Sequence, residues 1–125
     1  MIIGSKGAEL DLLIRQGATF LASSQMTTGG VPVDLTGAIL RAQIRKTPSN
    51  TIADGATAVC TITNAVEGRF TWEFTDESTA ALVAGVDEND SLSQYVWDME
   101  VEYADGRVYP VMYGIVKVFR EVTKP

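Results

Sequence analysis

The sequence predicts an all-β fold, an antiparallel β-sandwich of roughly seven to nine strands with one short helical turn. Short runs of strand-forming residues recur between clusters of turn-forming residues along the chain. Residues 95–103 alternate large apolar and mostly polar side chains, and the Asp105-Gly106 turn follows them, which is typical of a β-hairpin. The 125 residues, 46% hydrophobic and 21% charged, have the size and composition of one folded domain.

The order of strand and turn signals defines the expected elements. We expect an N-terminal arm over residues 1–8 and a single β-sandwich domain over residues 9–125. Residues 27–30 form a turn, and residues 31–37 form an extended link. We predict strands over residues 9–16, 18–26, 38–45, 56–63, 69–75, 93–103, 107–113 and 114–119.

Two strands show which side chains should form the core, because apolar residues recur at every second position along them. In residues 38–45 the other face carries Arg41 and Arg45, so we expect it to be solvated and basic. After residue 75 the alternation stops, and residues 76–83 combine a capping residue with early acids and an apolar end, which predicts one or two helical turns. The predicted core residues of the two strands are Leu40, Ala42, Ile44, Phe70, Trp72 and Phe74.

The hairpin has two possible registers. A two-residue Asp-Gly loop would place Met99 opposite Met112 and leave tyrosines on the acidic face of the sheet. A three-residue loop, Ala104-Asp105-Gly106, closed by a glycine bulge would gather the aromatic side chains on one face. We favour the second register, since a slip of one residue moves a whole apolar set into water. It predicts the cross-strand pairs Val101–Tyr109, Met99–Val111 and Trp97–Tyr113.

Charge and composition exclude several classes of function. A formal net charge of −6 is unfavourable for binding phosphate backbones, so we expect no nucleic-acid partner. No apolar run reaches the roughly 18 residues of a membrane helix, and residues 1–6 are far short of a signal-peptide core, so we expect no membrane insertion. Cys60, the single cysteine, cannot form an internal disulfide and is interpreted as a buried small hydrophobe.

Candidate chemistry is sparse because the sequence has no histidine, the commonest general base and metal ligand. Asp98, Glu100 and Glu102 share one strand face at spacings of about 7 Å, and we interpret them as a solvated or partner-facing surface rather than a catalytic pair. Residues 87–91 place oxygen side chains as a calcium loop does, but the glycine and glutamate of that motif are missing. We therefore expect no catalytic residue, no cofactor and no metal.

The two tryptophans offer a second interpretation. Flat aromatic rings can stack on sugars, so exposed Trp72 and Trp97 would indicate a carbohydrate-binding module. Both residues alternate in phase with other large apolar side chains, which favours burial in the core.

Several phrases of the sequence, taken in order, resemble small virion proteins of tailed bacteriophages, and in particular the immunoglobulin-like N-terminal domain of phage upper baseplate proteins. One of these phrases is Tyr95-Val-Trp-Asp-Met-Glu-Val101. The resemblance covers most of the chain from residue 9 onward and implies an immunoglobulin-like β-sandwich without catalytic residues. It is carried by residues 33–45, 68–82, 95–101, 105–108, 114–118 and 121–123.

The expected function is therefore that of a non-enzymatic structural component of a tailed-phage virion, a tail or baseplate accessory protein that acts through protein–protein docking. An edge strand or the acidic sheet face would meet a neighbouring subunit, and repetition would make many weak contacts stable. Other virion proteins, and further copies of the chain, are the expected partners, within a virion assembled in the host cytoplasm. The alternative is a carbohydrate-binding module that uses exposed aromatic residues. The predicted partner interface consists of Ile2, Ile3, Asp98, Glu100 and Glu102.

Overall fold

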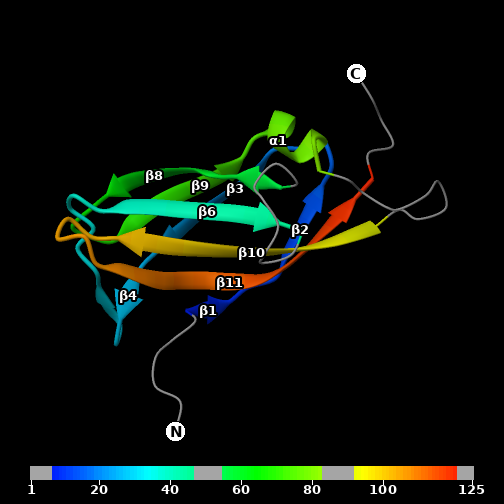
Figure 1. The fold of residues 1–125 in the computed structure, drawn as a ribbon. Helices are drawn as coiled ribbons and strands as arrows, with labels where there is room; N and C mark the ends of the chain where they lie inside the picture. The colour runs from blue at the N-terminus through cyan, green and yellow to red at the C-terminus, as the bar shows by residue number, and fades with distance from the viewer. Residues whose placement is uncertain (1–6, 47–54, 83–91, 121–125) are drawn as a thin grey trace, which may run out of the picture.

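Two β-sheets lie face to face in the computed structural model of the chain, which describes residues 7–46, 55–82 and 92–120 (Figure 1). The larger sheet has the strand order β1-β11-β10-β6-β7, and β2 also pairs with β11. Its strands are β1 (Ala8–Glu9), β2 (Leu12–Arg15), β6 (Ile39–Arg45), β7 (Ala56–Thr57), β10 (Leu92–Glu102) and β11 (Val108–Phe119). The smaller sheet has the order β3-β9-β8 and contains β3 (Phe20–Gln25), β8 (Val59–Asn64) and β9 (Arg69–Phe74).

This arrangement is an immunoglobulin-like β-sandwich, as the sequence predicted. One layer contains β11, β10, β6 and β7 side by side, and the other contains β3, β9 and β8, which matches the two sheets of immunoglobulin domains of the variable type. A small hairpin, β4 (Thr27–Thr28) and β5 (Val31–Pro32), occupies the predicted turn and the start of the predicted link. Gly29 and Gly30 form its loop, both with positive φ.

The first predicted strand differs in pairing from the antiparallel sandwich expected from sequence. Residues 9–16 are interrupted near Leu10, and both resulting strands, β1 and β2, run parallel to β11. The chain then turns at Gly17, which has a φ of 81°, and enters the other sheet as β3. The sandwich is therefore antiparallel except where β1 and β2 lie along β11.

The core lies between the two sheets and is joined by a tryptophan pair. Trp72 from β9 and Trp97 from β10 are 1% and 3% exposed, and their rings stack with centroids 5.0 Å apart. This pair connects the two layers in a chain whose single cysteine excludes the internal disulfide of antibody domains. The prediction that both tryptophans are buried is confirmed, and the six core residues predicted from β6 and β9 are buried as well.

The β10–β11 hairpin agrees with the favoured register near its turn and departs from it farther along. The Tyr103 N–H donates to the Arg107 carbonyl, Gly106 has a positive φ, and Val101 pairs with Tyr109, as predicted for a three-residue loop. A bulge then leaves Val111 without a cross-strand partner, next to Pro110, which has no N–H to donate. Met99 consequently pairs with Met112 and Trp97 with Gly114, so the predicted Met99–Val111 and Trp97–Tyr113 pairs are wrong.

Two other predicted elements differ in extent. Residues 56–63 change sheets at Ala58, with β7 beside β6 and β8 beside β9, and the Ala58 N–H donates to the Ala42 carbonyl. The predicted strands 107–113 and 114–119 are one continuous strand, β11. Half-buried Cys60 packs against the core, and burial raises its thiol pKa.

The predicted helical turn is confirmed as α1 (Asp76–Ala80), which Thr75 caps by accepting a hydrogen bond from the Ser78 N–H. The hydroxyl of buried Thr79 donates to the Ala18 carbonyl at 2.8 Å, which fixes α1 against the entrance to β3.

Candidate functional site: a groove on the outer face of the larger sheet

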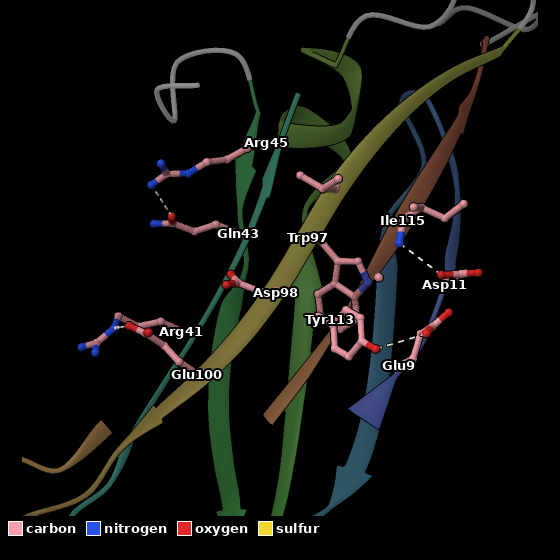
Figure 2. A pocket seen from close by; sticks show the side chains of 12 residues that line it. Glu9, Asp11, Arg41, Gln43, Arg45, Trp97, Asp98, Glu100, Tyr113 and Ile115 are labelled. Atoms are coloured by element: carbon pink, nitrogen blue, oxygen red, sulfur yellow. Dashed lines mark hydrogen bonds and ion pairs between the residues drawn. The ribbon is translucent and has the colours of Figure 1, made fainter. Parts of the chain in front are cut away.

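The outer face of the larger sheet is hollowed into a groove of about 710 Å³. Alternation places the even residues of β6 and the odd residues of β10 in the core, so their other side chains point outward. Four carboxylates and two guanidinium groups lie around the groove, which gives it a formal net charge of −2. The lining residues are Glu9, Asp11, Arg41, Gln43, Arg45, Val96, Trp97, Asp98, Glu100, Tyr113, Gly114 and Ile115 (Figure 2).

Arg41 neutralises one end of the acidic strand. It lies directly opposite Glu100 across the β6–β10 ladder, and its Nε donates to the Glu100 carboxylate at 2.9 Å. Its Nη2 donates to Glu102, two residues farther along β10, at 3.2 Å. These hydrogen bonds raise the Arg41 pKa, and the cation offsets the repulsion between the two carboxylates. Arg41, on the β6 face that the sequence predicts to be basic, thus lies against the acidic face of β10.

Asp98 lies between Gln43 and Tyr113, its cross-strand neighbours on β6 and β11 (Figure 2). Within the ranges that the structure describes, its carboxylate makes no hydrogen bond and no ion pair. Partial burial and, after it, the negative charge of Glu100 raise the Asp98 pKa, while Arg45 acts in the opposite direction. Asp98 is therefore a charge that a cation from another molecule would stabilise.

The opposite wall of the groove comes from the first residues of the fold. Tyr113 donates its hydroxyl to Glu9 at 3.2 Å, which raises the tyrosine pKa, and the Ile115 N–H donates to Asp11 at 3.1 Å. The link between β1 and β2 can approach β11 this closely because residue 114 is glycine. A Cβ at this position would clash with the Leu10 carbonyl.

The same approach positions a core side chain. The Trp97 indole N–H donates to the Leu10 carbonyl at 2.7 Å, so the tryptophan pair of the core is tied to this wall. The groove is therefore built on strands whose inward side chains form the core of the sandwich.

The structure brings together part of the interface predicted from sequence. Asp98, Glu100 and Glu102 share the outer face of β10, as expected, whereas Ile2 and Ile3 lie outside the described residues. Arg107 pairs with Asp105 in the hairpin loop.

Sequence reasoning missed Glu9, Asp11 and Tyr113 as groove residues. The first two reach the groove through the parallel pairing of β1 and β2 with β11, and the bulge at Val111 turns Tyr113 to the outer face. The glycine at position 114, inside an otherwise bulky strand, was a signal for a close backbone approach.

Other kinds of site find little support in the described ranges. Neither tryptophan is available for stacking on a sugar, because both are buried, and half-exposed Tyr109 packs edge-to-face on Tyr103. No group of three or more possible metal ligands occurs in residues 7–46, 55–82 and 92–120. The calcium-like residues 87–91 lie outside these ranges. No helix in the described part of the chain is long and apolar enough to cross a membrane.

Comparisons with known proteins give no match to a protein-family model and no match to a curated protein. Among solved structures, the chain is similar to the extracellular domains of the voltage-gated sodium channel β4 subunit, described as parallel homodimers with a role in cell–cell adhesion. That match has 11% identity and a TM-score of 0.38, and covers 98% of this chain and 100% of the other. A structure from a study of multimeric cell-adhesive interactions of sodium channel β subunits matches with 9% identity, a TM-score of 0.36 and the same coverage. The groove itself therefore has to indicate the function.

Proposed function

We propose that this chain is a non-enzymatic docking protein of a tailed-phage virion, in the tail or baseplate, and that it binds another virion protein through the outer groove. The virion assignment is supported by the resemblance of its sequence phrases to phage upper baseplate proteins. The docking mode is supported by the groove, which combines fixed charges with apolar side chains on a rigid sheet. Such a surface suits a protein partner better than it suits a small substrate that must be enclosed.

The observation that carries the proposal is the unpaired carboxylate of Asp98 in a groove of negative charge. A partner that places a lysine or arginine there would give Asp98 the counter-ion that this chain does not provide within its described ranges. Arg41 is already held by Glu100 and Glu102, and Arg45, whose charge acts on Asp98 without an ion pair between them, donates to Gln43, so a basic group in direct contact with Asp98 would come from another molecule. The partner is therefore a protein with a basic side chain at the centre of its contact surface.

The test is incorporation into purified phage particles, measured by quantitative mass spectrometry. Asp98→Lys reverses the charge at the centre of the groove, and we expect a loss of incorporation of about tenfold or more. Glu73→Lys is the matched control, because Glu73 lies on β9 with its side chain on the outer face of the smaller sheet. Normal incorporation of Asp98→Lys, or an equal loss in the control, would contradict docking through the groove. Absence of the wild-type chain from the particles would contradict the virion assignment.

A further inference from the structure

The β3 strand forms an open edge of the smaller sheet. It pairs with β9 on one side, and no other element of the described chain pairs with it. The opposite edge strand, β8, is partly closed, because the chain enters it from β7 with the Ala58 N–H bonded to β6. The edges of the larger sheet are formed by strands of two to four residues, whereas β3 has six. Short edge strands limit unwanted pairing, and β3 has no such limit.

The hydrogen bonds show which backbone groups of β3 face outward. The Met26 N–H donates to the Gly68 carbonyl at 2.8 Å, which continues the β3–β9 ladder by one pair. Hydrogen-bonded pairs alternate in an antiparallel ladder, so the even residues of β3 bond to β9. The N–H and C=O groups of Leu21, Ser23 and Gln25 therefore point to the open side, and no backbone hydrogen bond to another element is found for them in the described ranges.

The chemistry of this edge is uniform. No charged residue occurs between Arg15 and Asp34, the longest uncharged stretch of the sequence, and β3 lies within it. Lysines, prolines and inward-pointing charges are the usual means by which edge strands avoid pairing, and β3 has none of them. Its outward side chains are an exposed leucine, a serine and a glutamine, which tolerate a strand beside them.

We propose that the open edge of β3 pairs with β3 of a second copy of this chain, antiparallel about a two-fold axis at Ser23, to form one continuous sheet across the dimer. In this register Leu21 faces Gln25 of the other copy, Ser23 faces Ser23, and each of the three pairs exchanges two backbone hydrogen bonds. The register satisfies all the outward backbone groups on both copies at once.

The net charge of the chain favours a second copy as the partner of the β3 edge. Two chains of formal net charge −6 repel each other, so they meet most favourably where neither surface carries charge. The groove, with its net negative charge, is unfavourable for such a contact. Pairing of one six-residue edge buries less than the roughly 1,200 Å² of a stable interface, so the isolated dimer is weak and is strengthened by repetition in an assembly.

Disulfide trapping tests the register, with the full chain in a Cys60→Ser background. Ser23→Cys places two thiols opposite each other on the axis, so we expect covalent dimer to form about tenfold faster than with Thr71→Cys, on the outer face of central strand β9. Leu21→Cys and Gln25→Cys should each cross-link slowly alone, and the double variant should cross-link rapidly. The proposal would be overturned if Ser23→Cys formed covalent dimer no faster than Thr71→Cys. It would also be overturned if Leu21→Cys alone formed it as fast as Ser23→Cys.

Sedimentation measures the same contact without cross-linking. We expect the wild-type chain to dimerise as its concentration rises toward about 1 mM, and Ser23→Lys to remain monomeric because two lysines meet on the axis. A wild-type chain that stays monomeric throughout, or a Ser23→Lys variant that dimerises equally, would overturn the proposal. Neither measurement involves the groove. The proposed docking function can therefore fail while the pairing of β3 edges holds, and the pairing can fail while the docking function holds.

Discussion

The outer groove and the β3 edge are two surfaces of one sandwich with opposite chemistry. The groove collects charged side chains from β1, from the link between β1 and β2, from β6 and from β10, and Asp98 makes no hydrogen bond or ion pair in the described chain. The β3 strand, in contrast, presents backbone groups and no charge. The first surface is suited to a basic partner, and the second to an identical strand. In a chain with a net charge of −6, the two proposals together assign contacts with other proteins to the charged surface and contacts with a second copy to the uncharged one.

The largest expected effect comes from the tryptophan pair on which both surfaces depend. Trp72→Ala removes the ring that stacks on Trp97 and leaves a cavity between the sheets, so we expect the free energy of unfolding to fall by about 3–5 kcal/mol in urea titrations. Thr71→Ala, the neighbouring outward residue of β9, is the control. A decrease in the free energy of unfolding of less than about 1 kcal/mol would show that the two surfaces do not depend on the tryptophan pair.

Gly114→Ala should impair the groove and leave the β3 edge unchanged. The added Cβ would meet the Leu10 carbonyl, so the wall of the groove has to move, and we expect a loss of about 2 kcal/mol or more in stability and weaker binding of the partner. The β3 edge belongs to the other sheet, so the remaining folded protein should cross-link through Ser23→Cys at an unchanged rate. Stability equal to wild type would contradict the tight backbone approach.

The double variant Glu100→Lys, Glu102→Lys tests the acidic outer face of β10, on which Glu100 lines the groove and Glu102 lies beyond it. Arg41 loses both of its acceptors, but these side chains are partly exposed, so each lost ion pair should cost less than about 1 kcal/mol. We expect a folded domain with a slightly lower Tm that is poorly incorporated into particles. Normal incorporation would contradict docking through this surface.

Asp98→Asn should have the smallest effect on stability, and the effect should be favourable. The Asp98 pKa is raised above 3.8 in the folded protein, so the folded chain holds the proton more tightly than the unfolded chain, and stability falls as pH rises through this range. We expect Tm at pH 7 to rise by about 1–3 °C and partner binding to weaken.

The gain from Asp98→Asn should disappear in acid, below the unfolded pKa of 3.8, where the aspartic acid is also neutral. Asp105→Asn is the control of opposite sign, because the Arg107 N–H lowers the Asp105 pKa, so its ionised form is stabilising at neutral pH. A drop in Tm for Asp98→Asn at pH 7 would show that the carboxylate has a stabilising partner.

Local alternation predicted much of this fold, because each buried face of a strand repeats every two residues. It placed Phe70, Trp72 and Trp97 in the core and Glu100 on the outer face. It could not show that the chain changes sheets at Ala58, because the inward side of the pattern continues unbroken while the hydrogen-bonding partner changes.

The parts of the groove that were missed depend on long-range pairing. The bulge at Val111 decides that Tyr113 faces outward, and the local pattern on both sides of it is equally apolar. Glu9 and Asp11 reach the groove because β1 and β2 pair with residues about a hundred positions later in the chain. The residues around Glu9 and Asp11 give no local indication of this pairing. The acidic strand β10 was recognisable from sequence because its whole charged face lies within one element.

Site-specific photo-cross-linking in assembled particles tests the central claim most directly. A photoreactive residue at Gln43, beside Asp98, reports what covers the groove, and one at Ser23 reports what covers the β3 edge. We expect Gln43 to cross-link to a different virion protein and Ser23 to a second copy of this chain. A cross-link from Gln43 to a second copy, a cross-link from Ser23 to the groove's partner, or no product at either position would contradict these two assignments.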